Sequence, residues 1–135
     1  MGPRVTEAGL KVSRRTIAGA TALVLVGELD RATLEDALTL FTSGEGKTGG
    51  LARLVDLSRL EFADSSVIAL VYELVRRQPE NRWVGLISPS PGVMRVLSLG
   101  GLGGSAHVRI FRDDEEARAA VSAATRARRS RVQGT

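Results

Sequence analysis

Residues 51–77 read LARLVDLSRLEFADSSVIALVYELVRR, an aliphatic run followed by a polar tripeptide and then by a helical pattern. The aliphatic run at 51–57 predicts a buried strand, and residues 58–63 are interpreted as a connecting segment. From about Ser65 to Arg77 the apolar residues recur at helical spacing, which predicts a helix with one strongly apolar face. That face consists of Val67, Leu70, Val71, Leu74 and Val75. A strand followed by such a helix is the repeating unit of an α/β fold.

The residues before this stretch extend the same pattern toward the N-terminus. A buried strand is predicted at 21–27, TALVLVG, with a shorter edge strand at 10–17 before it. Asp30 is well placed as the N-cap of the helix that follows. One face of that helix is apolar, because four side chains fall at i, i+3, i+4 and i+7. They are Leu34, Ala37, Leu38 and Phe41.

The residues after this stretch continue the alternation toward the C-terminus. A strand is predicted at 82–88, RWVGLIS, and a third helix follows with Ser90 as its cap. The last strand is predicted at 106–111, AHVRIF, before a final helix that ends near Ala127. The strand–helix–strand unit from 51 to 88 should have a right-handed crossover.

These elements predict a single α/β domain with a mixed β-sheet of four to five strands and about four helices. A chain of 135 residues fits one domain and is long enough to bury a core of its own. We expect a flexible N-terminus at 1–9, the folded domain at 10–127 and a basic disordered tail at 128–135.

The composition excludes several classes of protein. The absence of cysteine excludes disulfides and thiolate metal sites, and one histidine, His107, argues against a histidine metal cluster or a Ser–His relay. The N-terminus lacks the apolar segment of a secretory signal, and no stretch approaches the ~18 apolar residues of a membrane span. We therefore expect a soluble, cytoplasmic protein without a cofactor or a metal.

The glycine-rich connector SGEGKTGG, residues 43–50, contains two weak nucleotide-binding patterns. Its glycines match G-x-G-x-x-G, and Gly46-Lys47-Thr48 resembles the end of a P-loop. A phosphate cradle needs a strand before the glycines and a helix after them, whereas here the predicted order is reversed. Phe41 also occupies the position of the first P-loop glycine, so nucleotide binding is not predicted.

The formal net charge is +4, and five arginines lie between Arg118 and Arg131. Such a segment fits either a patch for nucleic acid or an acidic partner, or a solvated helix end with a frayed tail. No aromatic residues are interleaved with these arginines to stack on bases, which favours the solvated helix end.

Two kinds of chemical site fit the sequence poorly. Asp56 and Asp64 are eight residues apart with no third ligand at a suitable spacing, which disfavours a metal pair. Ser65 lacks the G-x-S-x-G environment of a serine hydrolase, and His107 lies far along the chain on a predicted strand. We therefore expect no catalytic residues and no enzymatic activity.

The tripeptide Asp64-Ser65-Ser66 supplies more capping residues than one helix start requires. Asp64 or Ser65 could cap the helix, and this structural role alone would account for them. A helix N-terminus also carries partial positive charge and N–H donors, so it could accommodate a phosphate on Ser65. Such a phosphate would change the surface charge while the domain stayed folded, as a switch read by a partner requires.

Three segments together resemble the STAS domain, and more narrowly the bacterial anti-sigma factor antagonists. They are GELD at 27–30, LARLVDLSRLEFADSS at 51–66 and SPSPGVMRVLSLGGL at 88–102. The resemblance spans about residues 10 to 122. It implies a protein of transcription regulation that binds an anti-sigma factor and thereby releases a sigma factor.

The resemblance also assigns roles to residues of this chain. It implies that Ser65 accepts a phosphate from the anti-sigma factor, which is also a serine kinase, and that a phosphatase removes it. Asp30, Asp64 and Ser66 would belong to the partner-binding surface. Val67 would join them, in a position where the family usually has a glycine. The partners implied are proteins only, with no direct nucleic acid or membrane contact, for a monomer or weak dimer.

An alternative within the same family stays open. The chain could be a STAS scaffold or accessory subunit of a stress-sensing or lipid-transport complex that is not phosphorylated. Asp64-Ser65-Ser66 would then be a structural cap only, and Val67 in place of glycine leaves room for this interpretation.

Overall fold

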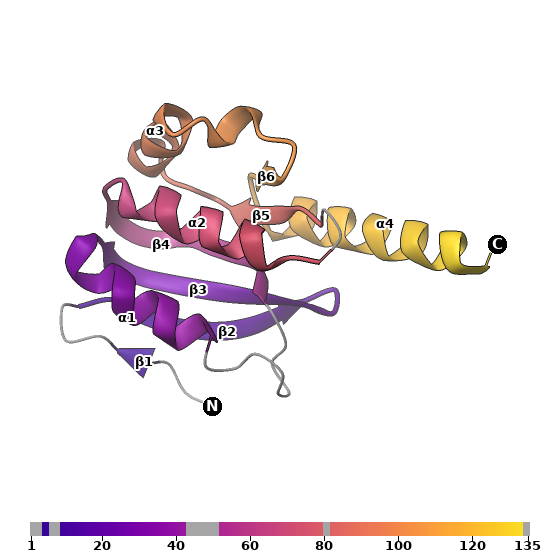
Figure 1. Ribbon diagram of the computed structural model, residues 1–135, viewed down its shortest axis with the longest axis horizontal. Helices are drawn as coiled ribbons and strands as arrows, with labels where there is room; N and C mark the ends of the chain where they lie inside the picture. The colour runs from indigo at the N-terminus through magenta and orange to yellow at the C-terminus, as the bar shows by residue number, and fades with distance from the viewer. Residues whose placement is uncertain (1–3, 6–8, 43–51, 80–81, 134–135) are drawn as a thin grey trace.

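The computed structural model describes residues 4–5, 9–42, 52–79 and 82–133 (Figure 1). Its strands are β1 (Arg4–Val5), β2 (Lys11–Ile17), β3 (Ala20–Leu29), β4 (Ala52–Ala63), β5 (Val84–Ile87) and β6 (Val108–Phe111). Its α-helices are α1 (Arg31–Thr42), α2 (Ser66–Arg77), α3 (Pro91–Leu99) and α4 (Asp114–Gln133), and a 3-10 turn, η1, spans Leu102–Gly104.

All six strands form one sheet in the order β1-β2-β3-β4-β5-β6. The pairs β1/β2 and β2/β3 are antiparallel, whereas β3, β4, β5 and β6 run parallel to one another. Helices α1, α2 and α3 connect the parallel strands, as parallel pairing requires. The predicted α/β class, the mixed sheet and the four helices are confirmed, and the two-residue strand β1 is added at one edge.

One face of the sheet packs against α1, α2 and α3. The larger apolar cluster lies here and joins Leu23, Leu25 and Leu57 of the sheet to Leu70 and Leu74 of α2. All five side chains are at most 1% exposed. Burying such a side chain stabilises the fold by roughly 1.5–3 kcal/mol, so this face supplies most of the core.

The other face of the sheet packs against the first half of α4. A smaller cluster joins Ile17, Leu54, Ile87 and Phe111 of the sheet to α4. Its members from α4 are Ala117 and Val121. Gly85 lies beneath this cluster, where an added Cβ would come within 2.6 Å of the Leu54 side chain, so only glycine fits there.

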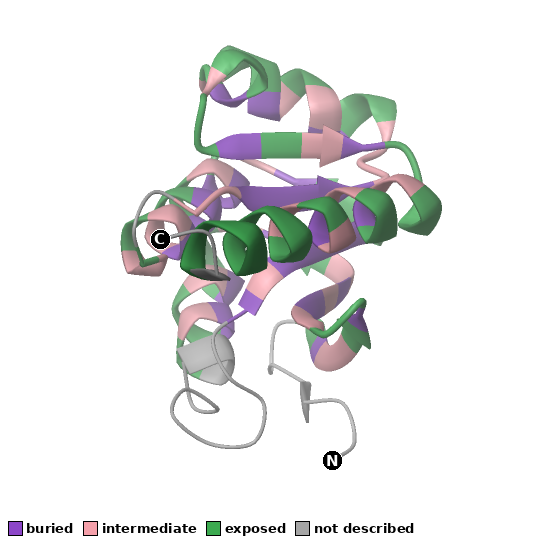
Figure 2. Cartoon of the chain, turned by 90° about the vertical axis from the view of Figure 1, so that its right-hand side faces the viewer, coloured by how far each residue is buried: buried purple, intermediate pink, exposed green. Residues whose placement is uncertain are grey.

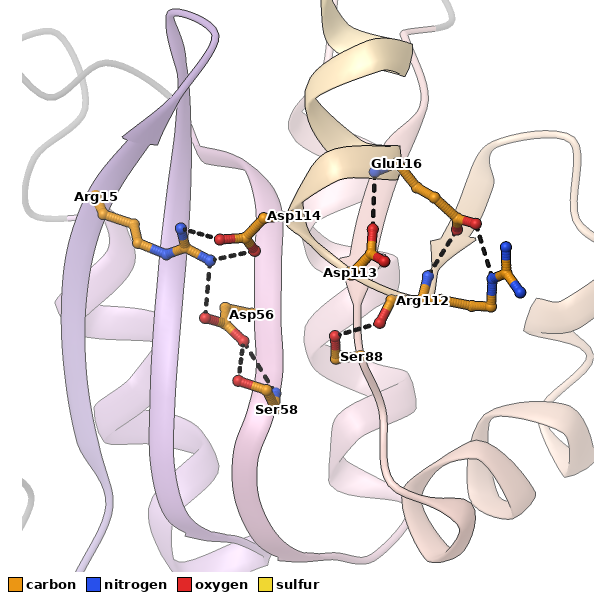
Figure 3. A network of polar contacts seen from close by, with 8 residues as sticks. All are labelled: Arg15, Asp56, Ser58, Ser88, Arg112, Asp113, Asp114 and Glu116. Carbon is orange, nitrogen blue, oxygen red and sulfur yellow. Dashed lines mark hydrogen bonds and ion pairs between the residues drawn. The ribbon is translucent and has the colours of Figure 1, made fainter.

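Polar contacts fix the start of α4 on this face (Figure 3). The Arg15 guanidinium donates hydrogen bonds of 2.9 and 2.8 Å to both carboxylate oxygens of Asp114. It also donates one of 3.0 Å to Asp56, whose other carboxylate oxygen accepts the Ser58 N–H and hydroxyl. Asp56 is only 7% exposed, and Arg15 and Ser58 supply the hydrogen bonds that a buried carboxylate requires.

Strand β4 is longer than the sequence predicts. Residues 58–63 were expected to connect the strand to the helix, but they continue β4 to Ala63. Register shifts interrupt the pairing with β3, and Leu57, Leu60 and Ala63 are buried at every third position instead of every second. These irregularities hide the strand from a search for strict alternation, because each extra residue in a bulge shifts the side chains that follow it to the other face.

The two ends of the chain also differ from expectation. Residues 1–9 were predicted to be flexible, but Arg4–Val5 form β1 and pair with β2. The final helix was predicted to end near Ala127 before a disordered tail, but α4 continues to Gln133. Alanine and arginine are strong helix formers, so the helix can persist where no core lies beneath it.

Candidate functional site

The sequence motifs around Asp30 and Asp64 meet at the end of two neighbouring parallel strands. Leu29 at the end of β3 is paired with Ala63 at the end of β4. The Asp64 N–H donates a hydrogen bond of 3.2 Å to the Leu29 carbonyl oxygen. Because α1 and α2 start directly after these strands, their N-termini lie side by side at one end of the sheet (Figure 1).

Asp30 caps α1 through reciprocal hydrogen bonds with Thr33. The Asp30 carboxylate accepts the Thr33 N–H at 3.0 Å, and the Asp30 N–H donates to the Thr33 hydroxyl at 2.9 Å. Thr33 is fully buried, so this pair locks the turn after β3. The predicted cap at Asp30 is confirmed, whereas Thr33 was missed although its place three residues after the cap is a recognisable signal.

A glycine shapes the turn that carries Asp30. Gly27 has a φ of 113°, in the region that favours glycine, and a Cβ there would lie 2.4 Å from the Gly9 carbonyl oxygen. Both facts require glycine at the first position of the GELD segment. The turn is thereby held against the start of the β2–β3 hairpin.

Asp64, not Ser65, supplies the side-chain cap of α2. Its carboxylate accepts the Ser66 N–H at 2.8 Å. Hydrogen bonds from Ser66, together with the nearby Arg31 N–H and guanidinium, lower the pKa of Asp64. Asp64 therefore stays ionised at neutral pH and connects the starts of the two helices electrostatically.

The Ser65 hydroxyl is left accessible by this arrangement. Ser65 is exposed, its backbone is already helical with φ −59° and ψ −9°, and its side chain makes no capping hydrogen bond. The expected free N–H donors are not free, because Asp64 accepts from Ser66 and Val67 while the Ser65 carbonyl oxygen accepts from Ile68. An added phosphate would thus meet the helix dipole and the exposed Arg31 rather than unsatisfied amides.

Ser66 and Val67 lie in the interior, whereas the resemblance to the family implies that they contact a partner. Val67 is fully buried and Ser66 is only 8% exposed. Val67 begins the stripe of α2 that packs on the sheet and continues through Leu70 and Leu74. Both residues are therefore reassigned to the interior, because helical periodicity turns the positions after Ser65 toward the core.

Several exposed side chains near Ser65 were not singled out from the sequence. Glu28 and Phe62 are neighbours in the register of β3 and β4, and Phe62 is 49% exposed. Tyr72 lies two turns beyond Ser65 on α2, and its hydroxyl donates a hydrogen bond of 3.4 Å to the carbonyl oxygen of Gly100 after α3. Phe62 and Tyr72 thus expose aromatic side chains on the strand before Ser65 and on the helix after it, and Glu28 adds an exposed acid beside Phe62.

Other predicted features fall away from this site or outside the described residues. Asp56 is engaged by Arg15, and the described residues contain no group of three or more acidic, histidine or cysteine side chains suited to a metal. The glycine-rich connector lies outside the described residues. In the described part of the chain no helix has the length and apolar character needed to cross a membrane.

Comparison with protein families matches residues 13–111 to the family described as Mlab, STAS domain. A search among curated proteins found no match. The matched segment begins in β2 and ends with β6, so it contains the sheet from β2 onward and the first three helices.

Three solved structures share the fold. A candidate anti-sigma factor antagonist from Thermotoga maritima has a TM-score of 0.64 and 19% identity, covering 90% of this chain and 93% of that one. The anti-sigma factor antagonist SpoIIAA in its unphosphorylated form has a TM-score of 0.57 and 23% identity, over 84% and 98%. An anti-sigma-factor antagonist (STAS) domain protein from Planctomyces limnophilus has a TM-score of 0.61 and 21% identity, over 81% and 95%.

Proposed function

The chain belongs to the STAS family described as Mlab, STAS domain, and from this premise we propose that it is an anti-sigma factor antagonist. In this proposal it binds an anti-sigma factor that is also a serine kinase, and so releases a sigma factor. Phosphorylation of Ser65 ends the contact, and a phosphatase restores it. The protein acts in transcription regulation as a binding protein and not as an enzyme.

The observation that carries the proposal is the exposed Ser65 hydroxyl at a helix start that does not need it. Asp64 already caps α2, so modification of Ser65 breaks no hydrogen bond of the fold. In the reaction the Ser65 oxygen attacks the γ-phosphorus of ATP, its proton leaves and ADP departs. The phosphatase reverses the modification by hydrolysis, which yields inorganic phosphate.

The surroundings of Ser65 give a physical reason for the switch. A phosphate adds about −1.5 to −2 charges at neutral pH. The Asp64 carboxylate is adjacent, and the exposed Phe62 and Tyr72 offer apolar surface to a partner. A partner that covers this region must desolvate the phosphate beside apolar atoms and a like charge. That can cost several kcal/mol, and each ~1.4 kcal/mol weakens binding tenfold.

The first experiment identifies the partner. The full chain is used for a pull-down from its source cells, followed by mass spectrometry of both the partner and Ser65. We expect an anti-sigma factor with kinase activity, and phosphate on a fraction of Ser65. Recovery of a partner of another class, with Ser65 unmodified under every growth condition, contradicts the proposal.

The second experiment measures binding of that partner to Ser65→Ala and Ser65→Asp. Ser65→Ala should bind at least as tightly as the wild type and resist the kinase. Ser65→Asp should bind at least tenfold more weakly, because it places a charge in the interface. Ser130→Asp, at an exposed position far along α4, is the matched control and should bind as the wild type does. Equal affinities of Ser65→Asp and Ser65→Ala rule the switch out.

A second function within the family is a STAS scaffold or accessory subunit of a stress-sensing or lipid-transport complex. The burial of Val67, where antagonists usually have a glycine, supports it, because the start of α2 is then built differently from that of the family. Incubation with candidate kinases and ATP separates the two functions. A scaffold gains no phosphate on Ser65, and its partner binds Ser65→Asp normally.

A further inference from the structure

The second half of α4 carries arginines where the first half carries the apolar residues that pack on the sheet. Ala117 and Val121 are buried on the face of α4 that meets the sheet. Seven and ten residues after Val121, the same helical stripe holds Arg128 and Arg131, and both are exposed. The last turns of α4 have therefore passed the edge of the sheet and project from the domain (Figure 1).

The projecting turns carry positive charge around most of their circumference. They contain Arg126, Arg128, Arg129 and Arg131, here named the basic overhang, and all four are exposed. At 3.6 residues per turn these side chains spread over an arc of roughly 220°. No aspartate or glutamate follows Glu116 in the sequence, so no acid of the same turns offsets them. Figure 2 shows this part of α4 largely exposed.

Three more arginines gather around Trp83, where strands β4, β5 and β6 begin. The guanidinium carbons of Arg53 and Arg109 lie 3.8 and 5.1 Å from the Trp83 ring centroid. The Arg53 Nε also donates a hydrogen bond of 3.0 Å to the Trp83 carbonyl oxygen. Burial and repulsion from Arg82 and Arg109 lower the pKa of Arg53 to about 10.

Among the described residues these three guanidinium groups have no carboxylate partner. Within the residues that the structure describes, Arg53, Arg82 and Arg109 form no ion pair with a carboxylate. Stacking on Trp83 holds two of them in place, and within the part of the chain that the structure describes their terminal guanidinium nitrogens donate no hydrogen bond. Fixed cations with free donors are suited to an anion that arrives from outside.

The tertiary structure joins the two groups of arginines. Arg109 lines an open groove of about 590 Å³ together with Glu116, Ala120 and Ala123 of α4. Trp83 and Ala120 pack against the same apolar cluster. The basic overhang begins at Arg126, within one turn of Ala123. The overhang and the arginines around Trp83 therefore form one surface, here named the basic surface.

The shape and charge of the basic surface fit duplex nucleic acid better than a membrane or an acidic protein. A helix that lies on a membrane needs an apolar face, which the overhang does not have because its arginines cover most of its circumference. Protein interfaces have an apolar centre with charges at the rim. On this surface arginines outnumber the one acid that lines the groove, Glu116, and that acid is already paired with Arg112. The major groove of DNA is about 12 Å wide, admits a helix and presents phosphates on both sides of it.

We propose that the basic surface binds duplex nucleic acid through its phosphates, with the overhang of α4 in the major groove and Arg109 and Arg53 on the adjoining backbone. Recognition is of backbone charge, because arginine contacts to phosphates carry no base sequence. The surface lies at the end of the sheet opposite to the start of α2, which Ser65 directly precedes, so this binding is separate from the proposed partner contact (Figure 1). The arginines of α4 alone do not favour nucleic acid, and it is the tertiary cluster at Trp83 that changes the balance.

The test measures binding of the full chain to a labelled duplex of about 20 base pairs by fluorescence anisotropy, at ~50 to ~200 mM salt. The key variant is Arg128→Gln/Arg129→Gln/Arg131→Gln. Its matched control is Lys11→Gln/Arg59→Gln/Arg95→Gln, which removes three exposed cations elsewhere and reaches the same net charge. Glutamine keeps the helix propensity of arginine, and circular dichroism verifies the fold of both variants.

We expect the wild type to bind with an affinity that falls as salt rises, by a slope of about 0.9 per phosphate contacted. The α4 variant should lose at least tenfold in affinity at the lowest salt, and its salt slope should fall by about one unit for each arginine that contacts a phosphate. Arg109→Gln removes a single contact, so its salt slope should fall by about one unit. The Lys11/Arg59/Arg95 control should keep the wild-type slope. Absence of wild-type binding at the lowest salt, or equal losses in variant and control, overturns the proposal.

Two further probes separate nucleic acid from other polyanions. Vesicles rich in phosphatidylglycerol and poly-glutamate are titrated under the same conditions. We expect the duplex to bind more tightly than either. If vesicles or poly-glutamate bind as tightly as the duplex and with the same loss in the α4 variant, nucleic acid is the wrong ligand. Ser65→Asp should bind the duplex as the wild type does, so failure of the partner switch and failure of this inference are distinguishable.

Discussion

At the scale of single residues, the start of α2 divides two tasks between neighbours. Asp64 follows the strand in an orientation that brings its carboxylate 2.8 Å from the Ser66 N–H, so it caps the helix. Ser65 is already helical, and its hydroxyl faces solvent. A residue that stabilises the fold is therefore distinct from the residue that can be modified. This division lets the surface change charge without unfolding the domain.

A substitution at the buried residue Val67 tests how the start of α2 packs on the core. Val67→Gly should destabilise the domain by about 2–4 kcal/mol, because it leaves a cavity in the core and places glycine in a helix. The measurement is urea unfolding followed by circular dichroism. Ala69→Gly is the control at an exposed position of the same helix and should cost only about 1 kcal/mol. Equal costs at the two positions would show that Val67 is not in the core.

At the scale of elements, α4 has two halves that do different things. Its first half is fixed by Arg15 and by two buried side chains, Ala117 and Val121 (Figure 3). Its second half has no sheet beneath it and presents arginines. One continuous helix thus serves as part of the core and as a projecting surface, which the composition of each half reflects.

Arg15 should therefore decide how firmly the start of α4 is held. Arg15→Met leaves Asp56 without its cationic partner and should cost about 1–2 kcal/mol at neutral pH, because Asp56 is largely buried. Chemical unfolding measures this cost. Lys11→Met, at an exposed position of the same strand, should change stability by less than about 0.5 kcal/mol.

The same variant has an expected pH dependence. The hydrogen bonds from Arg15 lower the pKa of Asp114, so their contribution is complete above the ordinary carboxyl pKa near 3.9. It is lost as pH falls through the lowered pKa. The stability difference between the wild type and Arg15→Met should narrow across that acidic range, as unfolding at a series of pH values can measure. A difference that grows toward low pH would contradict this assignment.

At the scale of the whole molecule, the two ends of the sheet carry different surfaces. Asp30, Asp64 and Ser65 lie where the parallel strands end, and the basic overhang projects beyond the end where these strands begin (Figure 1). The core lies between them on both faces of the sheet. The two surfaces can thus engage different ligands without competing for the same residues.

Removal of residues 126–135 tests whether the overhang belongs to the fold. We expect stability within about 0.5 kcal/mol of the full chain, because the removed arginines cover no core. Partner binding at Ser65 should also be unchanged. Removal of residues 117–135 is the contrasting variant. It uncovers the second cluster and should cost at least ~2–5 kcal/mol, if the protein folds at all. Similar thermal unfolding of both truncated chains would show that α4 does not pack on the sheet.

The sequence by itself determined the order of strands and helices from β2 onward, the cap at Asp30 and the placement of Ser65 at a helix start. These features depend on residues a few positions apart, whose spacing and capping chemistry are written directly in the chain. The extension of β4 to Ala63 was hidden because its register shifts replace strict alternation with burial at every third residue.

Only the tertiary structure decided that Asp64 takes the cap and leaves Ser65 free, and that Val67 turns inward rather than toward a partner. It also brought Arg53 of β4 and Arg109 of β6 to Trp83, which directly precedes β5 at the base of the basic overhang. Each of these outcomes depends on which groups meet across the sheet. Packing and charge act between atoms that are close in space, and their distance along the chain carries no record of that closeness.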